Sequence, residues 1–526
     1  MKKKMKKIIV AICMVVVISL SLSIANKSRS ANNEWNKEYE GMGIDHFFDI
    51  KPTNDGYIIA GTTWKPYEGQ LDTGNGWLVK VDKDGNIIWQ KHYGGRDEDG
   101  LWCVLETEDG YLAGGYSFSY ARGIGNEDFW LIKVDKNGNE IWNKTYGTYL
   151  GELGKVIKAK DGGYLIVGYI SSFKGVKSIN GSGILIKTDI NGEIKWYKTF
   201  DGNGFDYFYD VIETHDGYLI SGITESFATH GIWDAWLIKV DKQGNEIWNK
   251  TYGWRGYGWK GYVWNAYVKE EEDGYVIAGY VLLGRGEVPY AYLIKVNKEG
   301  NEIWKKVYGG GEYDYVKDFE VIDDGYILAG FTESYNVGNF DAWLLKVDKE
   351  GNEIWNKSFG RRWEDKFEGI VVLEDGYLLC GKTEHEWGYG NGWLVKCNDE
   401  VPPKIKIIKP KENHLYIFNR EIMAYSKTLI IGGITVVVEV DEPEKIDRVE
   451  FYYGSHYVFD EKPREIDYSP PYEWKCRVFG LNSWGRITVA ARYGNAGAVA
   501  VDKIELYIIN PLPPLPSPAS SASLHR

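Results

Sequence analysis

The chain has 526 residues, a formal net charge of −13 and 44% hydrophobic residues. Its aromatic content of 15% excludes intrinsic disorder over most of the length. The acidic charge balance argues against a nucleic-acid binder, because phosphate contacts need clustered Lys and Arg. Only 3 of the 15 Pro precede residue 401, so composition divides the chain at that point.

Residues 1–25 are predicted to be a targeting segment. Five Lys precede an apolar run from Ile8 to Ala25, which ends in the small-x-small form that signal peptidase accepts. The alternative is an uncleaved membrane anchor, because an 18-residue apolar run can just span a bilayer. With either outcome we expect the rest of the chain to be secreted or at the cell surface, with membrane contact only through this segment.

A sevenfold repeat occupies residues 34–400. Each unit contains a Trp, a Gly-Tyr pair and a block similar to Trp-Leu-Ile-Lys-Val-Asp, and the period is 51 to 57 residues. These are short apolar or alternating runs bounded by Gly, which indicate four strands per unit. Four-stranded sheets repeated radially predict an all-β fold, a seven-bladed β-propeller. The repeated Trp stands at 35, 89, 142, 196, 248, 304 and 355.

Counting strands predicts how the ring closes. The chain opens with a lone Trp strand, and the seventh unit ends at Cys397 with no Trp strand after it. We therefore expect Trp35 to Tyr39 to complete the blade built from residues 363–398. This closure removes a free sheet edge and joins the two ends of the ring.

The turn before each Trp carries a family resemblance. The Asp-x-x-Gly-x-x-x-Trp element resembles the tryptophan-docking motif of quinoprotein-type propellers, although its spacing is one residue shorter. The resemblance implies that the Trp packs between neighbouring blades. Quinoprotein dehydrogenases also use adjacent Cys and a calcium-bound quinone, and no two Cys are adjacent in this chain. We therefore expect the fold of the family and no quinone cofactor. The elements are Asp82/Gly85/Trp89, Asp135/Gly138/Trp142, Asp241/Gly244/Trp248 and Asp348/Gly351/Trp355.

Two polar positions recur in six of the seven units. An acid stands ten residues after the Trp, at Asp45, Asp99, Glu152, Asp206, Asp314 and Asp365. A polar residue precedes the third block, at Asn75, Asp128, Ser182, Asp234, Asp341 and Asn391. Unit five has Val263 and Tyr290 instead, and this joint loss predicts that the two positions meet. They could form a hydrogen bond between loops in each blade, or an acidic ring that holds a cation such as Ca²⁺.

The departures from the repeat supply the candidate binding site. Unit five has five extra residues in a Gly-interrupted loop from Tyr252 to Trp264 that is rich in Trp and Tyr. Aromatic rings stack on sugar faces, and Arg beside Trp can stack or bind carboxylates. The alternative is packing between blades or self-association. The candidate ligand-binding residues are Trp64, Trp254, Arg255, Tyr257, Trp259, Trp264, Arg362, Trp363, Trp387 and Tyr389.

After the boundary at Val401 comes a second kind of module. Roughly seven short strand-like runs in residues 401–510 fit an immunoglobulin-like sandwich. Two stretches, 470–474 and 487–491, resemble Ig-like modules of bacterial and archaeal surface proteins. Those modules usually continue Asp-Asn-Ala-Gly-Asn, where this chain has Gly-Asn-Ala-Gly-Ala at 494–498. Residues 511–526 are rich in Pro and Ser and are predicted to be an unstructured tail.

Signatures of catalysis are absent from the sequence. It contains no His-Glu-x-x-His and no Gly-x-Ser-x-Gly, and spacing alone does not reveal a pair of catalytic carboxylates. Cys380 and Cys397 fall on neighbouring predicted strands and could form a disulfide or remain buried thiols.

The sequence therefore predicts an exported, non-catalytic binding or structural protein. Its expected partner is a polysaccharide or an envelope protein, held by the aromatic loops of one propeller face. The alternative is a polysaccharide lyase or glycoside hydrolase on a propeller scaffold.

Overall fold

The computed structural model describes residues 33–65, 74–121, 127–147, 151–173, 176–200, 202–256, 259–284, 288–361, 363–386, 388–454, 463–476 and 483–509. The predicted targeting segment and the Pro/Ser-rich tail lie outside these ranges. The chain divides into two compact units, Met1–Val401 and Pro402–Arg526. Across the described residues, no helix has the length and apolar character needed to cross a membrane.

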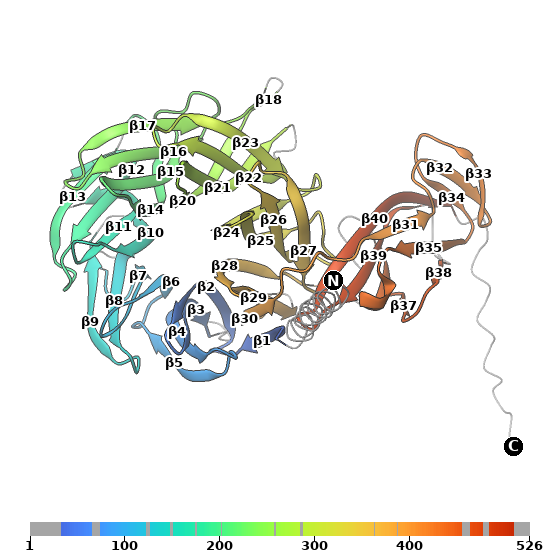
Figure 1. The fold of residues 1–526 in the computed structure, drawn as a ribbon, viewed down its shortest axis with the longest axis horizontal. Helices are drawn as coiled ribbons and strands as arrows, with labels where there is room; N and C mark the ends of the chain where they lie inside the picture. The colour runs from blue at the N-terminus through green and yellow to red at the C-terminus, as the bar shows by residue number, and fades with distance from the viewer. Residues whose placement is uncertain are drawn as a thin grey trace, which may run out of the picture. The chain divides into compact units, whose positions relative to one another are not determined.

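The first unit is a seven-bladed β-propeller (Figure 1). Its described residues form seven antiparallel sheets of four strands, which we number as blades one to seven. Blade one contains β2 (Ile44–Thr53), β3 (Gly56–Trp64), β4 (Gly74–Asp82) and β5 (Ile87–Tyr93). Blade two contains β6 (Asp99–Glu106), β7 (Gly110–Ser117), β8 (Asp128–Asp135) and β9 (Glu140–Tyr146). Blade three contains β10 (Gly151–Lys158), β11 (Tyr164–Phe173), β12 (Val176–Thr188) and β13 (Ile194–Phe200).

The remaining blades repeat this order. Blade four contains β14 (Asp206–Glu213), β15 (Gly217–Thr224), β16 (Asp234–Asp241) and β17 (Glu246–Tyr252). Blade five contains β20 (Tyr262–Glu270), β21 (Gly274–Leu283), β22 (Val288–Asn297) and β23 (Glu302–Tyr308). Blade six contains β24 (Asp314–Ile322), β25 (Gly325–Thr332), β26 (Asp341–Asp348) and β27 (Glu353–Phe359). Blade seven contains β28 (Lys366–Leu373), β29 (Gly376–Glu386), β30 (Tyr389–Cys397) and β1 (Trp35–Tyr39). A small hairpin of β18 (Arg255–Gly256) and β19 (Trp259–Lys260) precedes blade five.

The N-terminal strand closes the ring. β1 runs antiparallel to β30, with Trp35 opposite Lys396 and Tyr39 opposite Gly392. The resulting order β1-β30-β29-β28 is the one that the strand count predicts. The ring is therefore joined by hydrogen bonds between strands that lie more than 350 residues apart in the sequence.

Neighbouring blades are joined by the same contact at several junctions. Trp89 of blade one donates its indole N–H to the carbonyl of Lys136 in blade two, at 3.0 Å. Tyr93 donates its hydroxyl to the carbonyl of Gly138 in the same turn, at 2.6 Å. Gly138 has φ +75°, and a Cβ there would lie 2.9 Å from the ring of Trp89. The turn therefore needs Gly both for its left-handed backbone and for the close approach of the Trp. At the closure, Tyr39 makes the equivalent bond to the carbonyl of Gly85, at 2.6 Å.

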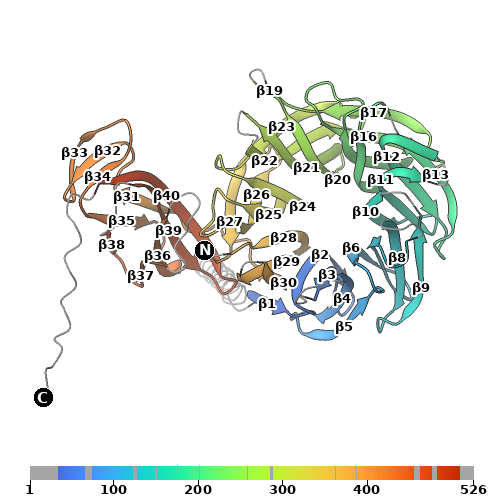
Figure 2. The same ribbon diagram turned by 180° about the vertical axis from the view of Figure 1, so that it is seen from behind.

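The innermost strands position the candidate site. The strands β2, β6, β10, β14, β20, β24 and β28 surround the centre of the ring (Figure 1), which Figure 2 shows from behind. Each innermost strand carries a register shift, as between Phe47 and Asp49 in β2. Such a β-bulge re-aims the side chains around it. Phe47 enters the core between blades, where it stacks on Trp77 at 4.7 Å, while Phe48 faces the centre of the ring.

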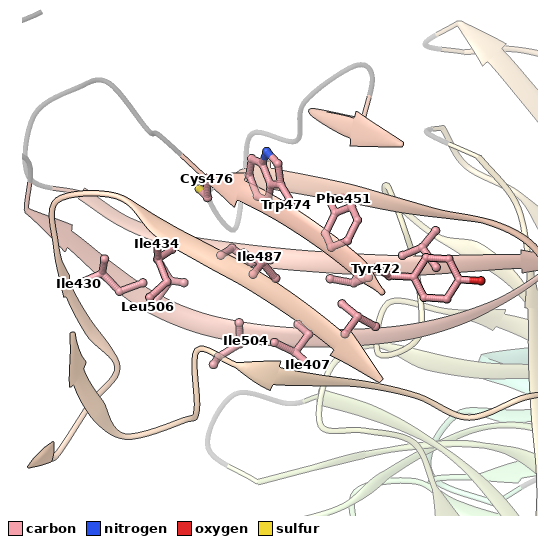
Figure 3. Close-up of a cluster of buried hydrophobic side chains, with 14 of the residues drawn as sticks. Ile407, Ile430, Ile434, Phe451, Tyr472, Trp474, Cys476, Ile487, Ile504 and Leu506 are labelled. Atoms are coloured by element: carbon pink, nitrogen blue, oxygen red, sulfur yellow. The ribbon is translucent and has the colours of Figure 1, made fainter. Parts of the chain in front are cut away.

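The second unit is an Ig-like β-sandwich. One sheet contains β31 (Ile405–Lys409), β35 (Ile434–Val440) and β38 (Tyr472–Cys476). The other contains β32 (His414–Ile417), β33 (Arg420–Ala424), β34 (Leu429–Ile431), β36 (Ile446–Gly454), β37 (Glu465–Asp467), β39 (Ser483–Tyr493) and β40 (Ala498–Ile509). A short 3₁₀ turn, η1 (Pro443–Lys445), precedes β36. Inward-facing side chains of both sheets, among them Phe451, Trp474 and Ile487, form the core (Figure 3).

The four cysteines of the described residues are buried thiols that form no disulfide. Cys380 lies opposite Leu394, and Cys397 lies opposite Tyr377. Of the two predicted alternatives for this pair, the structure therefore has two buried thiols and no disulfide. Burial raises the pKa of the Cys397 thiol to about 12, which leaves it protonated and unreactive at neutral pH.

Candidate functional site

The recurrent acids form hydrogen bonds inside the propeller. Asp45 is 1% exposed and accepts from the backbone N–H of Gly41 at 2.6 Å and from the hydroxyl of Thr63. Equivalent bonds tie Asp99 to Ser117, Asp206 to Thr224 and Asp314 to Thr332. These bonds join the start of the innermost strand to the end of the second strand, and they favour the hydrogen-bond interpretation. Among the residues that the structure describes, no group of three His, Cys, Asp or Glu is placed to hold a metal ion.

The inclusion of Glu152 among these acids is wrong. In blade three, Gly151 lies opposite Ile170, in the register where blade four has Asp206 opposite Thr224. Glu152 is one position further along, because the segment after Trp142 is one residue shorter than the segment after the other Trp. Counting residues from the Trp does not reveal this shift.

The two recurrent positions approach the same Gly at the junction of neighbouring blades. A Cβ at Gly360 would lie 2.7 Å from the carboxylate of Asp341 in blade six and 2.8 Å from that of Asp365 in blade seven. A Cβ at Gly94 would lie 2.6 Å from the side chain of Asn75 and 2.5 Å from that of Asp99. Burial raises the pKa of Asp365 to about 7. At the junction of blades six and seven, two buried carboxyl groups therefore lie close to Gly360.

The predicted aromatic candidates whose side chains are described come from blades one, five and seven. Tyr257, Arg362 and Trp387 lie outside the described residues, and for Arg255 and Trp259 only the backbone of the β18–β19 hairpin is described. The side chains described are Trp64, Trp254, Trp264, Trp363 and Tyr389.

Trp64, Trp254 and Tyr389 lie in three different surroundings. Trp64 lies beside Gly74, where a Cβ would be 2.5 Å from its indole nitrogen. Trp254 packs against Tyr292 with a centroid distance of 4.9 Å, under the ammonium of Lys305. Tyr389 is 50% exposed on blade seven. Trp64 and Trp254 therefore pack within blades one and five, while Tyr389 presents half of its side chain to solvent.

Trp264 belongs to a line of aromatic rings that crosses three blades. Tyr169 of blade three stacks on Phe205 at 4.7 Å, and Phe205 lies 6.1 Å from Trp233 of blade four. Trp233 meets Trp264 of blade five edge to face at 4.5 Å. All four rings are partly exposed, and we call them the aromatic path. The sequence-based site contains only Trp264 of this path.

The aromatic path leads to a cavity at the centre of the propeller. Tyr169 is also stacked on Tyr207, at 5.7 Å, and Tyr207 lies 4.4 Å from Tyr209. Tyr207 and Tyr209 line a cavity of about 240 Å³, together with Phe48, Trp102 and Tyr267. The innermost strands of all seven blades contribute to its wall. We call it the central cavity.

Charged groups occupy the remaining wall. Lys51 pairs with Asp49 at 2.5 Å, and Lys317 pairs with Glu368 at 3.4 Å. Burial tends to raise the pKa of Glu368, but Lys317 and His46 outweigh it and lower the pKa to about 2. Both carboxylates are therefore ionised at neutral pH.

Lys155 is the remaining ammonium of the cavity wall. Burial tends to lower its pKa, but the carboxylates of Asp49, Asp210 and Asp318 raise the pKa well above its ordinary value. Asp210 accepts a backbone N–H from Val268 at 3.1 Å, and Asp318 accepts one from Ile370 at 3.2 Å. Each of these carboxylates thus bonds to the next blade and holds Lys155 protonated from a distance.

A signal for this cavity is present in the sequence. The residue thirteen positions after the repeat Trp differs in type between units. In six units this position lines the central cavity, as Phe48, Trp102, Lys155, Tyr209, Lys317 and Glu368. A position that varies inside a regular repeat is the mark of a site, and it applies to the innermost strands as well as to the loops.

Comparisons with known proteins concern the fold alone. No protein-family model matches the chain. No curated protein matches it. A Pyrococcus horikoshii acylaminoacyl peptidase matches at 12% identity and TM-score 0.39, over 74% of this chain and 60% of the peptidase, so the chain spans about three fifths of that protein's length. An ulvan lyase of polysaccharide lyase family PL25 matches at 12% identity and TM-score 0.44, over 70% of this chain and 94% of the lyase. Fibronectin(III)-like modules of Clostridium thermocellum CbhA match at 15% identity and TM-score 0.16, over 50% of this chain and all of that one.

Proposed function

We propose that this protein is exported and acts outside the cell or at its surface as a non-catalytic binding protein for polysaccharide. The observation that carries the proposal is the aromatic path, in which partly exposed rings from three blades touch in sequence. Aromatic faces stack on the apolar faces of sugars, and the indole and phenol groups keep hydrogen-bonding edges. A line of such rings suits a chain of sugar units.

A polysaccharide suits this surface better than the envelope protein that the sequence also allows. A stable protein interface buries about 800 Å² on each partner, around a broad apolar centre. The aromatic path is one ring wide and leads to a cavity of about 240 Å³. A narrow path and a small cavity match a thin, flexible polymer.

Export is supported by the N-terminal sequence. Five Lys followed by the apolar run from Ile8 to Ala25 have the form of a secretory signal or anchor. We also place the propeller with the tryptophan-docking type of repeat and the second unit with Ig-like modules of surface proteins. The packing of Trp89 on the turn of the next blade supports the first assignment.

A glycan array tests the proposal. The full chain is compared with Trp233→Ala and with Trp484→Ala, a 52% exposed Trp of the second unit that serves as a matched control. One lost stacking contact is worth about 1 kcal/mol, so Trp233→Ala should bind roughly fivefold to tenfold more weakly while Trp484→Ala binds normally. Prolonged incubation with the bound glycan tests the enzymatic alternative. New reducing ends or unsaturated sugars would replace this proposal with a hydrolase or lyase.

A further inference from the structure

The aromatic path continues into the propeller. It passes from Tyr169 to Tyr207, which lines the central cavity. Two residues further along the innermost strands from Tyr267 and Asp318, Lys269 and Glu320 pair at 2.6 Å across blades five and six. This ion pair therefore joins two of the strands that line the cavity.

The size of the central cavity restricts its occupant. Pockets for drug-sized ligands measure about 300 to 1,000 Å³, and this cavity measures about 240 Å³. At roughly 30 Å³ for each water, it holds about eight waters. That room suits one sugar ring rather than several.

The wall of the cavity offers stacking and hydrogen bonding together. Trp102 and Phe48 present ring surface from blades two and one. Lys155 lines the same cavity, and its ammonium is held protonated by carboxylates that bond to backbone N–H groups of neighbouring blades. An ammonium has three donors and no acceptor. Lys155 can therefore donate to hydroxyl or ring oxygens of an occupant stacked against Trp102.

The charge of the wall favours a neutral occupant. Its ionisable side chains are Asp49, Lys155, Lys317, Asp318 and Glu368, three acids and two Lys. Asp49 is neutralised by Lys51, and Glu368 is neutralised by Lys317. The remaining ammonium, Lys155, interacts with the carboxylates of Asp49, Asp210 and Asp318. An anionic sugar such as a uronate would bring a negative charge beside ammonium groups that are already paired with carboxylates, so its charge would be poorly compensated.

Building on the proposed function, we infer that the central cavity is a subsite for the terminal unit of a neutral polysaccharide. The chain end enters the cavity, stacks on Trp102 and accepts hydrogen bonds from Lys155. The preceding sugar units follow the aromatic path across blades four and five. The protein therefore recognises the end of a polysaccharide chain as well as the sugar units that precede it.

Titration calorimetry with defined oligosaccharides tests this inference. The full chain is titrated with cellohexaose, maltohexaose, mannohexaose and hexagalacturonic acid. The neutral hexamers are also supplied as borohydride-reduced alditols and as oligomers methylated at the non-reducing terminal ring. We expect a neutral hexamer to bind, one of its two end-blocked forms to bind at least tenfold more weakly, and hexagalacturonic acid to bind more weakly still.

Variants of the cavity locate the effect. Lys155→Met keeps the length of the side chain and removes its donors, and Trp102→Ala removes the stacking surface. Each should weaken binding of the neutral hexamer at least tenfold, and Trp102→Ala keeps the test valid if Lys155→Met fails to fold. Lys427→Met, which removes an ammonium 4.4 Å from Trp484 in the second unit, is the matched control and should bind normally.

The outcomes separate the two proposals. Equal binding of intact and end-blocked hexamers, with unchanged affinity in both cavity variants, would overturn the inference and leave the proposed function standing. Preference for hexagalacturonic acid would overturn the neutral assignment. A glycan array with no binding at all would refute the proposed function and the inference with it.

Discussion

Removal of the closing strand is the strongest test of the architecture. Deleting residues 33–40 from the full chain removes Tyr39, which is 3% exposed and bonds to the carbonyl of Gly85. Loss of a buried aromatic side chain costs about 3 kcal/mol or more, and loss of its hydrogen bond costs about 1 kcal/mol. The surface contacts of β1, such as that of Lys37 with Asp84, add little. The deletion should therefore destabilise the propeller by at least about 4 kcal/mol.

That free energy converts into a measurable change in melting temperature. Unfolding entropy near the midpoint is about 2.1 cal/mol/K for each residue, or roughly 0.8 kcal/mol/K for a ring of this size. Tm should fall by about 5 °C in differential scanning calorimetry. A synthetic peptide of residues 33–41, added in excess, should restore much of the loss, because it can pair with β30 as β1 does. A shortened chain that melts within about 1 °C of the intact chain would refute the closure and the reasoning behind it.

Three further predictions follow from the blades. Gly138→Ala should lower Tm more than Gly162→Ala. Both glycines have positive φ, but only a Cβ at Gly138 would meet a ring, that of Trp89, at 2.9 Å. Equal decreases in Tm would show that the contact with Trp89 contributes nothing. Asp365 has its folded pKa raised by burial from 3.8 to about 7, so its contribution to stability is complete below pH 3.8 and is lost as pH rises to 7. Urea unfolding should therefore show Asp365→Asn gaining stability relative to the native chain across this range, by up to about 4 kcal/mol, with a constant difference above pH 7, and a difference independent of pH would contradict this. Cys103, Cys380, Cys397 and Cys476 should react with a maleimide only after unfolding, because all four are buried thiols outside disulfides. Mass spectrometry can locate the label, and rapid labelling of any of these four in the native chain would contradict the structure.

The fold was accessible from the sequence because each blade repeats the same local rules. The Trp, the Gly-Tyr pair and the Asp-x-x-Gly turn recur in order, and one unpaired Trp strand at Trp35 indicates how the ring closes. Alternation of side chains along a strand then gives the core.

The central cavity was less accessible, because the bulge in each innermost strand has no constant residue type. The register shift between Phe47 and Asp49 turns Phe48 toward the cavity. The residue types at these positions do not by themselves indicate a β-bulge. In blade three the connecting segment is one residue shorter, which moves Glu152 out of the acidic position. The aromatic path was missed for a related reason. Phe205 and Trp233 come from different strands of blade four, and only the tertiary structure brings them to Trp264.

The pairing of β1 with β30 also dictates the order in which the ring can form. Residues 35–39 leave the ribosome before every other strand of the propeller, and their partners at 392–396 leave it after the other strands of the propeller. The strand β1 therefore remains without its partner strand until β30 of the seventh blade has been synthesised. Closing a flexible loop of about 360 residues has an entropic cost of roughly 5 kcal/mol. The contacts between blades offset this cost, because they bring the two ends of the ring near each other before β1 pairs with β30. A nascent chain is consequently an open arc, and the molecule becomes a circle only after its last blade is complete.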